Sequence, residues 1–351
     1  MINAGIKKPR ESQIDIIRGV AIVTMIAANM APYLLQKPHP IYLRLYGTFA
    51  APLFILLSGM MVTRGYILKK YDFSKFLYRG LIILIIAALL DMALYRSVPF
   101  LTVDVLYLIG LSTILIYPIL GLSAKTKLGI SVIIFILTPV LQWLMKYPQD
   151  YYYITIKDNP VSLLNHLYDI FSNWISTAAF PIFPWFGYVV LGSAFGSLRW
   201  EEKEPRLFIG SNSITISVIL LISGSILFYL FPGPLYVRSD YSEMFYPATL
   251  GFILTSIGVI ALLFHITDRF YNSPLLYWLR PFGESSMFIY LAHGMIIQFL
   301  LAYIFGLRSF SYFFIIYLFL LAFMYGTTFI LRKIRPHLKT APLYVRIFFG
   351  A

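Results

Sequence analysis

The sequence predicts an all-α integral membrane protein: a bundle of about ten transmembrane helices with both termini in the cytoplasm. The first observation is composition, because 59% of the 351 residues are hydrophobic, only 12% are charged, and the mean hydropathy is +0.78. A typical soluble domain has about 25% charged residues. The second observation is a repeated apolar stretch of about 20 residues, the length that crosses the hydrocarbon core of a bilayer. The third is the distribution of Lys and Arg along the chain.

Ten apolar stretches, separated by short polar segments, are long enough to be spans. They cover residues 14–35, 45–68, 79–96, 103–122, 128–145, 174–198, 212–232, 247–267, 284–306 and 311–332. We expect them to form a single transmembrane domain over residues 1–351. The first stretch is expected to stay in the protein as a span, because it contains charged residues and lacks a clear signal-peptide cleavage site.

The basic residues predict the orientation of the bundle, because Lys and Arg accumulate in cytoplasmic loops. With the N-terminus inside, most of the 28 basic residues fall in cytoplasmic segments. The outside segments hold only Lys37, Arg44, Arg96, Lys146, Lys157, Arg238 and Arg308. An even number of spans then places both termini in the cytoplasm. The formal charge of +13 thus comes mostly from basic residues expected beside the inner leaflet. No nucleic-acid partner is expected.

The cysteine and histidine content narrows the chemistry. The chain has no cysteine, which excludes disulfides, thiolate nucleophiles and Cys-ligated metals. The histidines lack the spacing of metal ligands, so no metal cofactor is expected. They are His39, His166, His265, His293 and His337.

Polar residues recur on one face of the first predicted span. Asp15, Arg18 and Asn29 share this face, and Arg18 and Asn29 are about 16 Å apart along a helix axis. Ionisable residues inside a membrane are costly and are therefore functional candidates. Two structural roles remain open: Asp15 and Arg18 forming an interfacial ion pair, and Asn29 bonding a neighbouring helix.

His39 follows in an outside turn, between Pro38 and Pro40. Its imidazole can take a proton from a hydroxyl or amine and return it to a leaving group. Asn29 could orient that acceptor or stabilise an oxyanion. Many loop histidines are simply surface residues, so the residues alone leave both interpretations of His39 open.

Five segments resemble, in the same order, motifs of the transmembrane acyltransferase superfamily. They are SQIDIIRGVAIVTMIAAN, HPIYLRLYGTFAAPLFILLSG, VLYLIGLSTILI, FPIFPWFGYVVLGSAFG and FGESSMFIYLAHGMII. The chain is most similar to the heparan-α-glucosaminide N-acetyltransferase-like branch, because it has Asn29 where the branch that decorates bacterial glycans tends to have histidine. It differs from the former branch before Pro52, where an acidic residue is expected and none is present.

The resemblance implies acyl transfer, with His39 and Asn29 as catalytic residues. His39 would be a general base or a covalent acyl carrier. Acyl-CoA, expected to be acetyl-CoA, would enter from the cytoplasm, and a sugar or glycolipid hydroxyl or amine would be acylated on the outer face. The residues expected to bind the donor are Arg18, Asp15, Arg64, Arg280, Ser286, Tyr290 and His293. For the last three residues, a role in helix packing stays open.

The alternative function is a multi-span transporter or lipid flippase that performs no acyl transfer. Such proteins also use many spans and buried polar residues. Asn29 and His39 lie together at the outer rim of the predicted bundle. This arrangement fits a chemical reaction better than the alternating-access mechanism of a transporter. The expected partners are acyl-CoA, the acceptor and the lipid bilayer of the plasma membrane, with a homodimer left open.

Overall fold

The computed structural model describes residues 11–147, 167–201, 211–233, 244–338 and 340–349. Within these ranges the regular structure is helical, apart from one isolated β-bridge between Leu35 and Arg308. Eight of the described helices are long and apolar enough to cross a membrane. The prediction of an all-α, multi-pass membrane protein is therefore confirmed.

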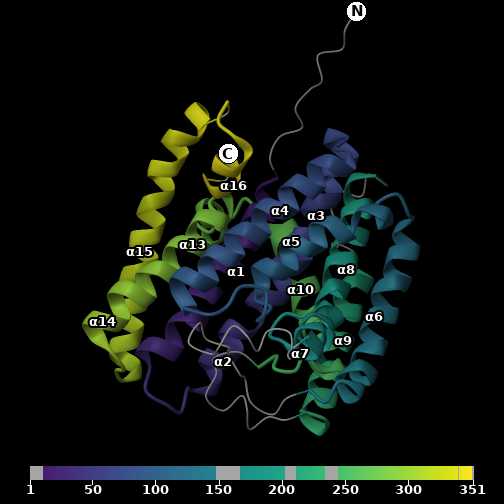
Figure 1. The fold of residues 1–351 in the computed structure, drawn as a ribbon, viewed down its shortest axis with the longest axis horizontal. Coiled ribbons are helices and arrows are strands. Elements are labelled where there is room, and N and C mark those ends of the chain that lie inside the picture. The colour runs from purple at the N-terminus through teal and green to yellow at the C-terminus, as the bar shows by residue number, and fades with distance from the viewer. Residues whose placement is uncertain (1–10, 148–166, 202–210, 234–243, 339, 350–351) are drawn as a thin grey trace, which may run out of the picture.

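The helices follow the predicted spans closely along the chain (Figure 1). The first group is α1 Ser12–Leu34, α2 Ile41–Thr48, α3 Ala50–Lys69, α4 Phe73–Leu90, α5 Val105–Leu115 and α6 Ala124–Leu144. The second group is α7 Leu167–Ser172, α8 Ile182–Trp200, α9 Ser211–Leu230 and α10 Leu250–Phe270. The third group is α11 Pro274–Tyr277, α12 Arg280–Glu284, α13 Ser286–Ile296, α14 Ala302–Phe305, α15 Phe310–Ile334 and α16 Leu343–Phe349.

Two predicted spans are less regular than the sequence implied. The stretch 103–122 contains α5, which has only 11 residues and is followed by a 3-10 turn at Tyr117–Ile119. The stretch 174–198 is broken into Ile170–Thr177 and Ile182–Trp200, which meet at 48°. Proline accounts for the irregular start of α8, because extended Pro181 lies in the break just before the helix and Phe183, which precedes Pro184, is also extended. Counted as one span, this bent pair raises the number of described spans to nine.

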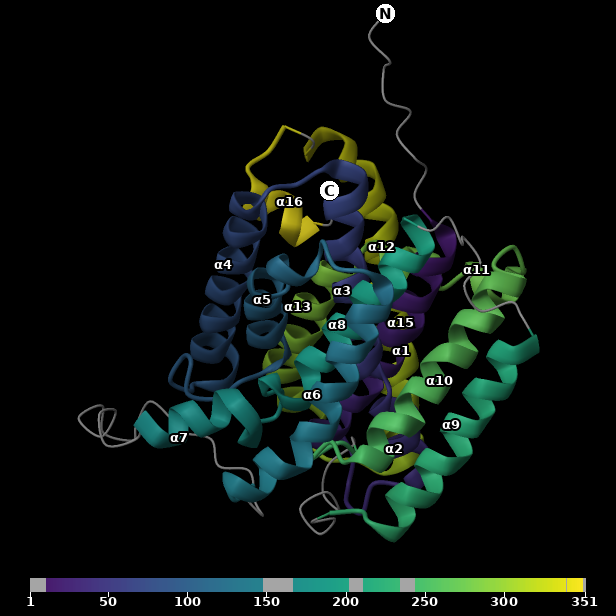
Figure 2. The same ribbon diagram turned by 90° about the vertical axis from the view of Figure 1, so that its right-hand side faces the viewer.

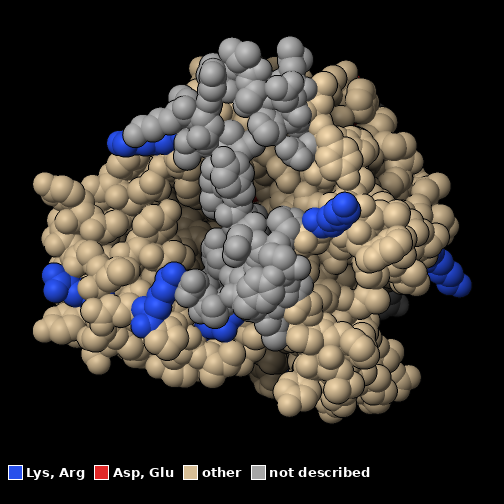
Figure 3. All heavy atoms as spheres, turned by 60° about the horizontal axis from the view of Figure 1, so that its bottom comes forward, with Lys and Arg blue, Asp and Glu red and all other residues tan. Residues whose placement is uncertain are grey.

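The two ends of the bundle are distinct. In Figures 1 and 2, α16 lies at one end, and α2 and α7 lie at the opposite end. We call these the α16 end and the α2 end. Figure 3 looks toward the α2 end, where the visible Lys and Arg side chains lie singly and form no patch. The side of the membrane that each end faces stays a prediction.

Glycines allow α3 and α8 to pack backbone against backbone. A Cβ on Gly59 would overlap the carbonyl of Val189, and a Cβ on Gly192 would overlap the carbonyl of Leu56. Small residues permit this close approach between membrane helices. The contact fixes α3 in place, and α3 forms one wall of the cavity described below.

Candidate functional site

A cavity of about 2270 Å³ lies within the bundle. Its walls come from α1, α3, α4, α5 and α13, and α16 also contributes. Pockets for drug-sized ligands typically measure about 300–1,000 Å³. The cavity therefore has room for a large cofactor together with a second substrate.

The predicted polar face of α1 lies along this cavity. Asp15, Arg18, Met25 and Asn29 all line it. Arg18 also approaches Asp15, with 3.8 Å between Nη1 and Oδ1. Arg18 therefore pairs with Asp15 and also lines the cavity, so the structural role and the site role are compatible.

Basic side chains from three helices line the part of the cavity nearest α16. They are Arg64 and Lys69 of α3, Lys75 and Arg79 of α4, and Arg346 of α16. The Nε atoms of Arg64 and Arg346 are buried and have no hydrogen-bond partner among the described residues. A buried donor left unsatisfied costs about 1–3 kcal/mol. Two such guanidinium groups on one cavity make it suited to an anionic ligand such as a phosphate.

Asn29 contacts a histidine from another helix. Its Nδ2 atom lies 3.0 Å from Nε2 of His293 in α13. The other ring nitrogen of His293, Nδ1, lies 2.7 Å from the carbonyl oxygen of Ile289. His293 is 1% exposed, while Asn29 is half-buried and lines the cavity. The structure thus joins two residues of the sequence-predicted site that are far apart in the chain.

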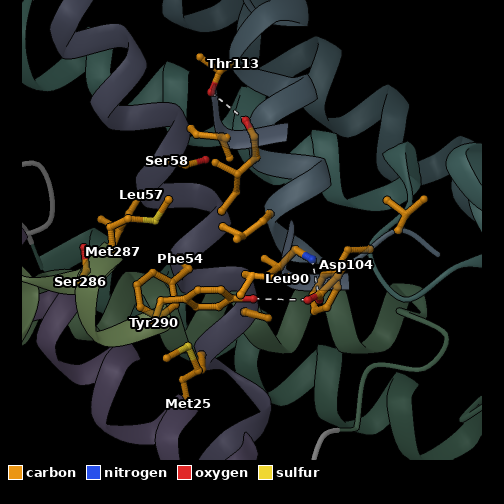
Figure 4. A pocket seen from close by; sticks show the side chains of 18 of the residues that line it. Met25, Phe54, Leu57, Ser58, Leu90, Asp104, Thr113, Ser286, Met287 and Tyr290 are labelled. Carbon is orange, nitrogen blue, oxygen red and sulfur yellow. Dashed lines mark hydrogen bonds between the residues drawn. The ribbon is translucent and has the colours of Figure 1, made fainter. Parts of the chain in front are cut away.

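Ser286 and Tyr290 line the cavity from the same helix as His293. The Tyr290 hydroxyl lies 3.4 Å from Oδ2 of Asp104, and its ring stands edge-on to the His293 ring, with 5.8 Å between centroids. Figure 4 shows Tyr290 pointing toward Asp104. The other carboxylate oxygen of Asp104 accepts the Val105 backbone N–H at 2.7 Å, which caps α5.

Asp91 and Asp104 are cavity carboxylates that the sequence analysis did not single out. Asp104 precedes α5, and Asp91 accepts a 2.6 Å hydrogen bond from the Tyr107 hydroxyl. A sequence signal existed for both, since each lies within or beside a predicted span, where acidic residues are rare. Among the described residues, no group of three or more His, Asp or Glu is placed to hold a metal ion.

His39 and Arg280 are not among the residues that line the cavity. His39 is 5% exposed, and its Nε2 atom lies 3.3 Å from the Leu35 carbonyl oxygen. Arg280 donates to Glu284 at 2.8 Å and to the Tyr277 hydroxyl at 3.1 Å. Burial lowers the pKa of Arg280, but the neighbouring Glu284 carboxylate outweighs this, so its pKa lies above the ordinary value.

The fold and the cavity define a multi-pass membrane protein with a large internal site that can take an anionic ligand at its basic end. A family model described as heparan-alpha-glucosaminide N-acetyltransferase, catalytic, matches residues 10–234. The chain belongs to this family of membrane acetyltransferases. No curated protein and no solved structure matches it. The matched region contains Asn29 and His39, while His293 and Arg346 lie beyond it.

Proposed function

We propose that the protein transfers an acetyl group from cytoplasmic acetyl-CoA to an amine or hydroxyl of a sugar or glycolipid at the outer face of the plasma membrane. One observation carries this proposal: a single cavity is lined both by Asn29 and by Arg64 and Arg346, whose Nε atoms have no partner among the described residues. Family membership supports the transfer of acetyl groups. The donor, the acceptor and the membrane sides are part of the proposal.

The donor phosphates bind at the basic end of the cavity, to Arg18, Arg64 and Arg346. The pantetheine arm then passes Ser58 and Ser286, which lie along the cavity wall in Figure 4. Asn29 lies about 16 Å from Arg18 along the axis of α1, at 1.5 Å per residue. The thioester reaches Asn29 while the phosphates stay at the basic end.

In the reaction, the acceptor nitrogen or oxygen attacks the thioester carbonyl carbon and gives a tetrahedral oxyanion. The carbon–sulfur bond then breaks, and CoA leaves as a thiolate that takes up a proton. We assign the general base, which accepts the proton of the attacking group, to His39. This assignment rests on the family-like motif that contains His39, since the residue itself is not among the described residues that line the cavity. The Leu35 carbonyl can only accept a hydrogen bond, so Nε2 of His39 donates to it.

The same residues allow a covalent variant, in which His39 attacks the thioester and carries the acetyl group to the acceptor. A stable isotope label on the acetyl group separates the two mechanisms. Acetyl-His39 trapped by acid quench and found by peptide mass spectrometry supports the carrier, and direct transfer leaves no labelled histidine.

The test uses the full chain in lipid nanodiscs, with acetyl-CoA and glucosamine as the first acceptor. We expect CoA release that depends on the acceptor, and formation of N-acetylglucosamine detected by mass spectrometry. Asn29→Ala serves as the control with strongly lowered but measurable activity. Tight acetyl-CoA binding without transfer to glucosamine or to a panel of glycan and glycolipid acceptors would overturn the proposal. A transporter or flippase would instead move acetyl-CoA or lipid across proteoliposomes without releasing CoA.

A further inference from the structure

We infer that His293 is a positioning residue that holds the Asn29 amide in one orientation, with its carbonyl oxygen turned away from His293 and available to the cavity. This inference rests on the proposed function, because it assigns a role to Asn29 in binding the acceptor. It depends on hydrogen-bond chemistry at three atoms: Nδ1 and Nε2 of His293, and Nδ2 of Asn29.

The first step is the tautomer of His293. Its Nδ1 atom lies 2.7 Å from the carbonyl oxygen of Ile289, one turn earlier in α13. A carbonyl oxygen only accepts hydrogen bonds, so Nδ1 carries the hydrogen. In a neutral imidazole the other nitrogen, Nε2, then holds a lone pair and can only accept.

The second step is the orientation of the Asn29 amide. With Nδ2 3.0 Å from the Nε2 lone pair, the amide donates N–H to the ring. The flipped amide would place its oxygen lone pairs against the Nε2 lone pair, which is repulsive. A doubly protonated ring would need the flipped amide, with Nε2–H donating to Oδ1, and it would bury a positive charge in a side chain that is only 1% exposed, which is costly. The neutral Nδ1–H tautomer and a single amide orientation therefore stabilise each other.

The third step is the rigidity of the pair. His293 is 1% exposed, and the edge-on ring of Tyr290 packs beside it. Tyr290 in turn contacts Asp104 through its hydroxyl. A ring held by the Ile289 carbonyl and by the Tyr290 ring, both in its own helix α13, gives Asn29 a stable partner.

The consequence is a division of roles at the site. Asn29 lines the cavity, and within the described residues its Oδ1 atom makes no hydrogen bond. Oδ1 thus binds the N–H or O–H of the attacking acceptor, which fits an amine or hydroxyl substrate. His293 itself does not take the proton, because its Nε2 lone pair already accepts from Asn29.

The kinetic test compares two substitutions that differ in which ring nitrogen they imitate. His293→Gln places an amide oxygen near the position of Nε2, where it can accept from Asn29, and should retain most of the kcat for transfer to glucosamine. His293→Asn reaches only the Nδ1 position and should lower kcat by roughly 10- to 100-fold, the range of coupling between contacting residues. The Kd for acetyl-CoA and the unfolding temperature should stay close to those of the parent protein in both variants.

Coupling to Asn29 gives the decisive readout. In an Asn29→Ala background, His293→Asn should cause little further loss, because its effect acts through Asn29. If His293→Gln and His293→Asn lower kcat equally, and both losses persist in the Asn29→Ala background, His293 acts as a base. That result would overturn the inference. Losses that appear only in the unfolding temperature would make it a packing residue.

A measurement without turnover separates this inference from the proposed function. In protein labelled with ¹⁵N histidine, the His293 signals, assigned by their disappearance in His293→Gln, should report a neutral ring protonated at Nδ1. Asn29→Ala should shift the Nε2 signal. An Nε2–H tautomer, or an imidazolium at neutral pH, would overturn the inference even if acetyl transfer occurs. The expected tautomer without any transfer would instead count against the proposed function.

Discussion

Arg64 of α3 and Arg346 of α16 line the same cavity, and in each the Nε atom is buried with no hydrogen-bond partner in the described part of the chain. The two residues come from widely separated parts of the chain. Arg346 also lies beyond the region that matches the family model, which ends at residue 234. The C-terminal helix therefore contributes to a site whose other walls belong largely to the family region.

The first prediction is that Arg346→Ala and Arg64→Ala each weaken acetyl-CoA binding. A hydrogen bond to a charged group contributes about 1.5–3 kcal/mol, which corresponds to roughly 10- to 100-fold in Kd. Isothermal titration with acetyl-CoA in nanodiscs measures the change. Dephospho-CoA lacks the 3′-phosphate, and pantetheine lacks every phosphate. Both compounds should therefore lose less affinity when an arginine is removed.

Arg308→Ala is the matched control, since it removes the same charge from an exposed position that does not line the cavity. It should leave the Kd almost unchanged. A similar loss in all three variants would mean that acetyl-CoA responds to overall charge and not to a built phosphate site.

The sequence was sufficient to predict most of the spans and the polar face of α1, because both depend on periodicity and hydropathy. It was also sufficient to single out Asn29 and His293 as candidate site residues. It could not show that they touch, because the contact depends on how α1 and α13 pack. Asp104 was not singled out for the same reason. Its contact with the Tyr290 hydroxyl depends on how α13 packs beside the start of α5.

α5 and α8 show a second limit of the sequence. Hydropathy predicts one continuous span over 103–122, yet α5 covers only Val105–Leu115. Apolar residues that continue past the end of a helix give no sign of where the helix ends. In α8 the signal was present, since Pro184 restricts Phe183, but a bend and a straight span have the same hydropathy.

The second prediction is that His39→Ala abolishes most acetyl transfer while acetyl-CoA still binds. Loss of a general base typically lowers the rate by about 10²–10⁴-fold. In the parent protein the rate should fall as the pH is lowered, because a protonated imidazole cannot accept a proton. In His39→Ala this acidic limb of the pH–rate profile should disappear.

The control for His39 is His337→Gln, an exposed histidine that does not line the cavity. Its pH profile should match that of the parent protein. Full activity in His39→Ala, with the acidic limb intact, would exclude His39 as the base and direct attention to the cavity carboxylates Asp91 and Asp104.

The third prediction concerns the contact between α3 and α8. Gly192→Leu should lower stability by at least the 1–3 kcal/mol typical of overpacking, because the new side chain meets the backbone of Leu56 and not a movable side chain. Thermal unfolding in detergent measures the loss. Gly326→Leu in α15 is the control, since a Cβ there has no neighbouring atom within 4 Å. An unfolding temperature that falls equally in both variants would show that leucine itself, and not helix contact, causes the loss.

The last prediction is the orientation of the bundle, which follows from the low number of basic residues in the expected outside segments. The chain has no cysteine, so single-cysteine labelling needs no background substitutions. Gln36 and Lys333 are exposed in the structure and belong to opposite predicted sides. In intact cells, Gln36→Cys should react with a membrane-impermeant maleimide, while Lys333→Cys should react only after the membrane is opened. The donor mechanism requires this result, because the basic end of the cavity must face cytoplasmic acetyl-CoA. The reverse pattern would place that end outside the cell and exclude cytoplasmic acetyl-CoA as the donor.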